Sequence, residues 1–297
     1  MSENPPIRAG FAIVNRNPLI AAIEIAWRWT FGLIGTVLLL LGTRAFLAGL
    51  KVSEGDEQVL HGQDPTLIAA ALMHVLQQSG VLQRFFGIMA AVAIPSALVW
   101  IAAATLGRAA TLRRLMPTSD VNVKAILGLT LARAGLLLAA VIAWYVWMLL
   151  CAILTITPDQ PNYPLYLLLS MLALPVIAIV WGVLNWILSL APVIAARDGS
   201  RAWKAYSDTV GVVRRHRGEF TSVSTWLGLP RLAAMVIAFM IAVVVLIATD
   251  SIIIGSVALT LITLVYCAFA DYLYIVRLAA YAQIARELPI ATAATPL

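Results

Sequence analysis

Long apolar segments without charged side chains dominate the pattern of hydrophobic and polar positions along the chain. Residues 232–249 form one such segment of eighteen positions, and Asp250 closes it. The hydrocarbon core of a membrane is about 30 Å thick, and a helix needs about 20 residues to cross it. The pattern therefore predicts an all-α transmembrane helix bundle with six spans, at residues 18–50, 85–106, 125–155, 165–195, 231–249 and 251–275.

Composition supports a single integral membrane domain over residues 1–297. Hydrophobic residues make up 62% of the chain, charged residues make up 11%, and the mean hydropathy is +0.94. The connections between the predicted spans are shorter than the roughly 50 residues that a soluble domain needs. A net charge of +6 would suggest nucleic acid for a soluble protein. In a membrane protein, basic residues gather in cytoplasmic loops, so we expect lipid and no nucleic acid as a partner.

The charges of the connections predict the topology. The connections at 108–124 and 197–231 are basic, whereas those at 51–83 and 157–164 are not. Because loops rich in Lys and Arg stay in the cytoplasm, this alternation places both chain ends inside (N-in/C-in). The first outer connection also contains an amphipathic pattern at 65–80. It predicts an external helix whose apolar face holds Leu67, Leu72, Met73 and Leu76.

The second basic connection predicts a cytoplasmic amphipathic helix over residues 200–214. Its apolar stripe recurs at spacings of 3, 4 and 3, and consists of Trp203, Tyr206, Val210 and Val213. Its other faces carry the basic residues Arg201, Lys204 and Arg214. Such a helix suits an anionic inner leaflet, and its stripe can equally pack on the cytoplasmic ends of the spans. These side chains are therefore candidate contacts for lipid or for a partner protein.

Small and polar residues inside the spans predict contacts between helices. The third span has a stripe of small residues, which lies at Gly128, Ala132, Gly135 and Ala139. Small residues permit close helix approach, either within the bundle or against another subunit, including a second copy of the chain. Asn185 in the fourth span either lines a ligand cleft or bonds to a neighbouring helix. Glu24 and Arg28, four positions apart, are expected to pair on one helix face.

Catalytic and metal-binding patterns are missing from the sequence. The three histidines, at 61, 74 and 216, show neither zinc spacing nor an arrangement for haem. Asp198-Gly199-x-x-Ala202 resembles the opening of the phosphatidyltransferase signature that acts on CDP-alcohols. However, Trp203 stands where that signature has arginine, and the further metal-binding aspartates do not follow. We therefore expect no catalytic residue, cofactor or metal.

The C-terminal third is similar to a group of six-span bacterial membrane proteins. The resemblance rests on LAPVIAARDGSRAWKAYSDTVGVVRRHRGEF at 190–220 and on YLYIVRLAAYAQIARE near the end of the chain. The group includes the YciC-like proteins and the membrane domain attached to some glycerophosphodiester phosphodiesterases. The resemblance implies a multi-pass protein of the bacterial cytoplasmic (inner) membrane, and it carries over no catalytic residue.

Three functions fit these observations. The first is a non-catalytic membrane module, either an accessory or scaffold subunit of a larger membrane complex or a lipid-interacting domain. The second is the permease component of an ATP-driven transporter, in which the helix at 200–214 would contact the ATPase. The third is a lipid-modifying membrane enzyme, which the missing acid, base and metal groups disfavour. The first function is the prediction from sequence.

Overall fold

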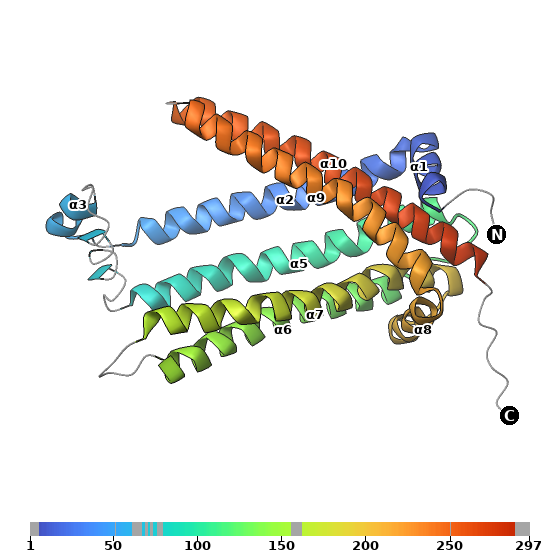
Figure 1. Cartoon of the computed structure of the whole chain (residues 1–297), viewed down its shortest axis with the longest axis horizontal. Helices are drawn as coiled ribbons and strands as arrows, with labels where there is room; N and C mark the ends of the chain where they lie inside the picture. The colour runs from blue at the N-terminus through green and yellow to red at the C-terminus, as the bar shows by residue number, and fades with distance from the viewer. Residues whose placement is uncertain are drawn as a thin grey trace. The chain divides into compact units, whose positions relative to one another are not determined.

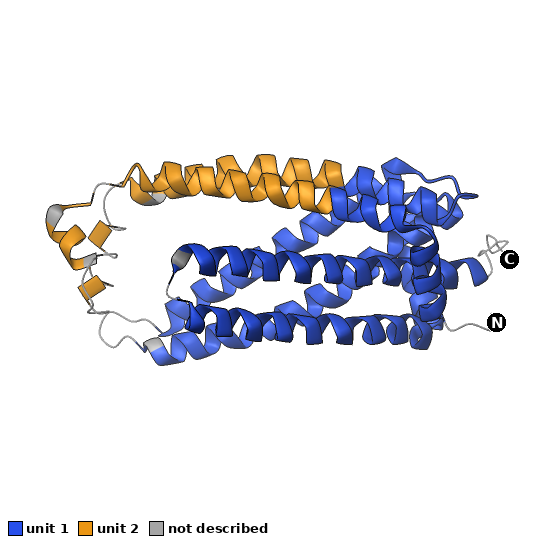
Figure 2. Ribbon diagram, turned by 90° about the horizontal axis from the view of Figure 1, so that it is seen from above, with its two compact units in different colours: residues 1–26, 104–297 blue, residues 27–103 orange. Residues whose placement is uncertain are grey.

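The computed structural model describes residues 6–50, 52–60, 67–68, 71, 74–75, 80–155, 162–249 and 251–288. These residues form helices and their connections, without a strand (Figure 1). The helices are α1 (Pro6–Arg16), α2 (Pro18–Leu47), α3 (Glu54–Leu60), α5 (Val81–Leu115), α6 (Val123–Thr155), α7 (Tyr163–Asp198), α8 (Ala202–Arg215), α9 (Arg217–Ala248) and α10 (Ile252–Glu287). The chain divides into two compact units, one of residues 1–26 with 104–297 and one of residues 27–103 (Figure 2).

Six of the described helices are long and apolar enough to cross a membrane. They lie at Pro18–Leu47, Gln83–Leu115, Val123–Thr155, Pro164–Asp198, Arg217–Ala248 and Ile253–Glu287. The prediction of six apolar helices is therefore confirmed. Three helices extend well beyond their predicted spans. α5 continues to Leu115 rather than 106, α9 begins at Arg217 rather than at 231, and α10 continues to Glu287 rather than ending at 275. A charged residue ends an apolar run without ending the helix, since outside the hydrocarbon a helix tolerates polar side chains.

The larger unit is built from helix pairs. α6 packs along α7, α9 packs along α10, and α8 lies against α7 and α6. The short α1 lies on α10, where Gly10 allows the two backbones to meet. A Cβ at this glycine would stand 2.7 Å from the carbonyl oxygen of Val276. α7 ends at Gly199, whose φ of 61° is the left-handed conformation that glycine adopts at helix C-termini, and α8 starts three residues later.

The hydrophobic core of this unit lies at one end of its long helices. It includes the last turns of α7 and α10, the first turns of α6 and α9, the end of α5, and α1. In the most apolar eighteen-residue window of each candidate span, between 0% and 11% of the residues are buried. Exposed leucine, isoleucine and valine cover the other halves of α6, α7, α9 and α10. Such a distribution suits helices whose outer surfaces face lipid.

We call the end that holds this core the basic end, because the chain's basic connections and helix termini gather there. Its basic residues include Arg8, Arg16, Arg108, Arg113, Arg114, Lys124, Arg197, Arg201, Lys204, Arg214, Arg215, Arg217, Arg277 and Arg286. α1 and α8 both lie at the basic end (Figure 1).

The smaller unit contains most of α2, α3 and the first part of α5. Gly42 of α2 faces Val92 of α5, and the rings of Phe46 and Phe85 meet edge to face with centroids 5.6 Å apart. At the start of α3, the hydroxyl of Ser53 and the ring of His74 bond to Asp56 and lower the pKa of that carboxyl. Most of the external helix predicted at 65–80 lies outside the described residues. The described part at 67–68, 71 and 74–75 is helical.

Candidate functional site at the basic end

The buried face of α8 shares only Val213 with the apolar stripe that the sequence predicted. Its buried residues are Ala205, Thr209 and Val213, which face α6 and α7. Trp203 is 79% exposed, so the prediction that it packs on the ends of the spans is wrong. The physical reason is steric, because small side chains let α8 approach its neighbours more closely than an indole would.

The exposed Trp203 of α8 stacks on Tyr206, which is half-buried and packs against the residues of α6 and α7 that cover Ala205. The rings of Trp203 and Tyr206 stack at a centroid distance of 5.8 Å and an interplanar angle of 30°. Arg201 and Lys204 are exposed beside them, and Arg214 is exposed near the end of the helix. We call Arg201, Trp203, Lys204 and Tyr206 the α8 patch. Val210, predicted to belong to the same contact surface, is half-buried.

Only the first member of the small-residue stripe on α6 lies at a tight helix contact. A Cβ on Gly128 would stand 2.8 Å from the Cβ of Ala202, at the start of α8. Ala132, Gly135 and Ala139 are exposed, and a Cβ on Gly135 would have no atom within 4 Å. Of the two alternatives, packing of these three residues against other helices of the larger unit is therefore not seen, because all three are exposed on α6. Contact with another subunit stays a prediction.

Asn185 connects two spans. Its Oδ1 accepts a hydrogen bond of 2.6 Å from Nε of Arg133, which joins α7 to α6. Both side chains are partly buried. The bond gives the guanidinium of Arg133 a polar partner on the neighbouring span.

A buried polar cluster that sequence reasoning missed joins α2, α5 and α10. Glu24 is fully buried, and its Oε1 lies 3.4 Å from Nη2 of Arg108, whose side chain is 8% exposed. The hydroxyl of Thr111 donates to Oε2 of Glu24 at 2.7 Å. Arg108 also donates to the hydroxyl of Tyr274. Glu24 of α2 and Arg108 of α5 thus form a buried ion pair, and the hydrogen bond to Tyr274 connects this pair to α10.

Two arginines accompany the ring of Tyr274 in this cluster. The guanidinium carbons of Arg108 and Arg277 lie 5.1 and 5.0 Å from the ring centroid, within the range of cation–π attraction. Nη1 of Arg108 and the hydroxyl of Thr105 are buried and have no hydrogen-bond partner among the described residues. One sequence signal for the cluster existed, since Arg108 interrupts a run of small apolar residues rather than lying in a polar loop.

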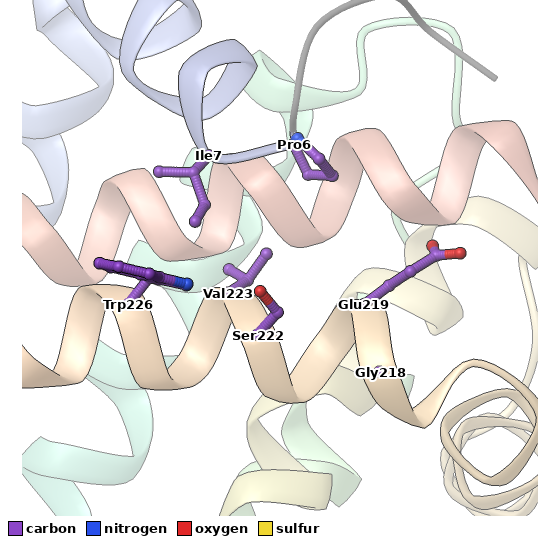
Figure 3. Close-up of a pocket in the computed structure, with 7 residues that line it drawn as sticks. All are labelled: Pro6, Ile7, Gly218, Glu219, Ser222, Val223 and Trp226. Atoms are coloured by element: carbon purple, nitrogen blue, oxygen red, sulfur yellow. The ribbon is translucent and has the colours of Figure 1, made fainter.

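A cavity of about 510 Å³ opens at the same end, between the start of α1 and the first turns of α9 (Figure 3). Pro6 and Ile7 approach it from α1. The other lining residues belong to α9 and are Gly218, Glu219, Ser222, Val223 and Trp226. Figure 3 shows Trp226 and Glu219 at opposite ends of the group with Ser222 between them, so the cavity has an apolar end and a polar end. No sequence motif indicated it.

The helices and this site define a multi-pass membrane protein with a compact, basic end. Within the described part of the chain, no group of three or more His, Cys, Asp or Glu residues could hold a metal ion. No protein-family model, curated protein or solved structure matches the chain.

Proposed function

We propose that the chain is a non-catalytic integral membrane module of the bacterial cytoplasmic membrane, and that its basic end contacts anionic lipid headgroups from the cytoplasmic side. The observation that carries this proposal is the α8 patch, where an indole that is 79% exposed lies between exposed Arg201 and Lys204. The N-in/C-in topology drawn from the loop charges puts this patch at the inner leaflet.

Two physical arguments support lipid as the partner of the α8 patch. A tryptophan ring that is largely exposed to water is unfavourable, whereas the headgroup boundary accommodates tryptophan and tyrosine. Each basic side chain near an anionic surface contributes about 1 kcal/mol, so three of them contribute about 3 kcal/mol. α8 also follows the last turn of α7 after a short connection, so it starts close to the end of a span.

The proposal is tested by comparing lipid retention in the purified protein. Arg201→Gln, Lys204→Gln and Arg214→Gln together should lower binding of phosphatidylglycerol, measured by native mass spectrometry, by about a hundredfold at low salt and by less as salt increases. Trp203→Ala should weaken the same binding without lowering the unfolding temperature, because the ring packs on no core residue. The charge-matched control replaces the exposed Arg113 and Arg114 in the last turn of α5 and the exposed Lys124 at the start of α6.

Equal losses in the two triple variants would mean that the lipid responds to net charge alone and would contradict a role for the α8 patch. The permease component of an ATP-driven transporter is the alternative that the same patch favours, because Trp, Tyr and Arg are enriched in the centres of protein interfaces. Co-purification of an ATPase that Trp203→Ala abolishes, with phosphatidylglycerol binding unchanged, would support this alternative.

A further inference from the structure

We infer that the cavity between α1 and α9 binds the primary ammonium headgroup of an aminophospholipid such as phosphatidylethanolamine. This inference rests on the proposed contact of the basic end with lipid headgroups, and it concerns a second site with the opposite charge preference. The cavity volume of about 510 Å³ falls within the range of about 300–1,000 Å³ that is usual for small-ligand sites.

The charge of the cavity lining selects a cation. Among the described residues that line it, Glu219 alone carries a charge, although the surrounding end of the protein is basic. Oε1 of Glu219 lies 3.7 Å from Nδ1 of His216, which is not part of the lining, and the Glu219 side chain is 48% exposed, so a ligand can still reach the carboxylate. An anionic headgroup would meet this carboxylate without a lining cation to offset it, whereas an ammonium group would be attracted.

Helix geometry places two groups that suit an ammonium and one aromatic ring on the same face of α9. Glu219, Ser222 and Trp226 are separated by three and four positions, and such residues are neighbours on a helix surface. The carboxylate and the hydroxyl accept hydrogen bonds from a primary ammonium. The indole suits the boundary between the headgroup and the acyl chains. A quaternary ammonium has no N–H to donate, so the lining favours an ethanolamine headgroup over a choline headgroup.

The position of the cavity along α9 suits a lipid. The exposed large apolar side chains of α9 begin at Trp226 and continue through Leu229 and Leu232. Trp226 thus marks where the helix surface becomes apolar, and Glu219 lies seven residues earlier, about 10 Å along the axis. The polar layer of a membrane leaflet is about 5–8 Å thick. An aminophospholipid with its amine toward Glu219 and its glycerol toward Trp226 and Ile7 matches this gradient.

The experiment measures binding of single lipids to the detergent-purified full chain by native mass spectrometry. The probes are dioleoyl phosphatidylethanolamine, its choline and glycerol counterparts, and glycerophosphoethanolamine, which has the amine but no acyl chains. The ethanolamine lipid should bind roughly three- to tenfold more tightly than the choline lipid, because a charged hydrogen bond at a half-exposed carboxylate is only partly screened. Glycerophosphoethanolamine should not displace it. Displacement at comparable concentration would identify a soluble amine instead and would overturn the lipid assignment.

Variants locate the binding in the cavity. Glu219→Gln should remove the preference for ethanolamine. Trp226→Leu keeps an apolar side chain but loses the interfacial indole, so it should weaken binding of all the lipids by about two- to fivefold. The control is Asp120→Asn, which removes an exposed carboxylate from the α5–α6 connection outside the cavity lining. Glu219 is half-exposed, so Glu219→Gln should keep the wild-type unfolding temperature. An ethanolamine preference that survives Glu219→Gln overturns the inference.

The two lipid proposals fail separately. The triple variant of Arg201, Lys204 and Arg214 should lower phosphatidylglycerol binding and keep the ethanolamine preference. One outcome supports the α8 proposal and refutes the cavity site: the triple variant loses phosphatidylglycerol binding, and Glu219→Gln keeps the ethanolamine preference. The reverse pattern supports the cavity and refutes the α8 patch.

Discussion

The buried pair of Glu24 and Arg108 should stabilise the basic end as a unit, and a double-variant cycle can measure this. Removal of one partner from a buried ion pair costs about 3–5 kcal/mol, because the remaining charge is left without compensation. Glu24→Leu is therefore expected to destabilise the protein by about this amount. Arg108→Met should lower the free energy of unfolding by less than Glu24→Leu does, for two reasons. Glu24 keeps its hydrogen bond of 2.7 Å from the hydroxyl of Thr111. The substitution also removes Nη1 of Arg108, a buried donor that has no partner among the described residues.

The double variant Glu24→Leu with Arg108→Met is the decisive measurement. Replacement of both partners by apolar residues is often neutral or stabilising, so the double variant should be more stable than either single variant. For a chain of this size, about 2 °C of unfolding temperature corresponds to 1 kcal/mol, so Glu24→Leu should lower the temperature by roughly 6–10 °C and Arg108→Met by less. Thr111→Val removes one bond to a carboxylate and should cost about 1.5–3 kcal/mol.

The assay is thermal unfolding in one detergent, followed by far-UV circular dichroism at a fixed scan rate, because membrane-protein unfolding is commonly irreversible. Glu287→Gln, at the exposed end of α10, is the matched carboxylate control. Losses that simply add in the double variant would refute the pairing, since independent sites add and coupled sites do not. An unchanged unfolding temperature for Glu24→Leu would show that this carboxylate is not buried.

Three further predictions follow from the packing, the topology and the smaller unit. Gly128→Leu should lower the unfolding temperature because its side chain meets Ala202, whereas Gly135→Leu should not, and equal effects would contradict the described contact. A cysteine at the exposed Gln58 should react with a membrane-impermeant thiol reagent in intact cells, and one at the exposed Ser207 should not; the reverse would exclude N-in/C-in. Folding lowers the pKa of Asp56, so the ionised carboxylate stabilises the folded protein fully above the ordinary pKa of 3.8. This stabilisation is lost as the pH falls through the lower pKa of the folded state. The stabilities of the wild type and of Asp56→Asn, measured by acid unfolding, should therefore converge at low pH.

The sequence predicted the helices well where the physical constraint is strong. A span in hydrocarbon has to be long, apolar and helical, and the charge-free runs therefore identified α2, α5, α6, α7, α9 and α10. The same rule ceases to apply outside the hydrocarbon. The first turns of α9 and the last turns of α10 were missed because their arginines, at 217 and 277 for example, look like loop residues.

The candidate site depended on contacts that periodicity does not specify. The spacing of Trp203 and Tyr206 predicted the helix α8, but hydrophobicity ranks tryptophan above alanine, whereas close packing on α6 and α7 selects Ala205. For Glu24, helix spacing suggested Arg28, while the buried contact with Arg108 joins segments far apart in the chain. The cavity between α1 and α9 likewise exists only after the chain is folded.

The concentration of the core at the basic end implies that tolerance to substitution should change along the length of the helices. Many of the buried positions there are alanines, which lie between larger buried side chains such as Leu278 and Tyr281. In α10 they are Ala279, Ala280, Ala282 and Ala285, and in α7 they are Ala191, Ala195 and Ala196. At such positions shape decides, and even one added methyl group is felt. In the other halves of the helices, the exposed leucine and isoleucine residues need only remain hydrophobic. Many exchanges among aliphatic residues there should therefore leave stability unchanged. In a saturation mutagenesis library, each long helix should therefore show two segments. Tolerance to substitution depends on side-chain volume in the segment at the basic end, and on hydrophobicity alone in the other.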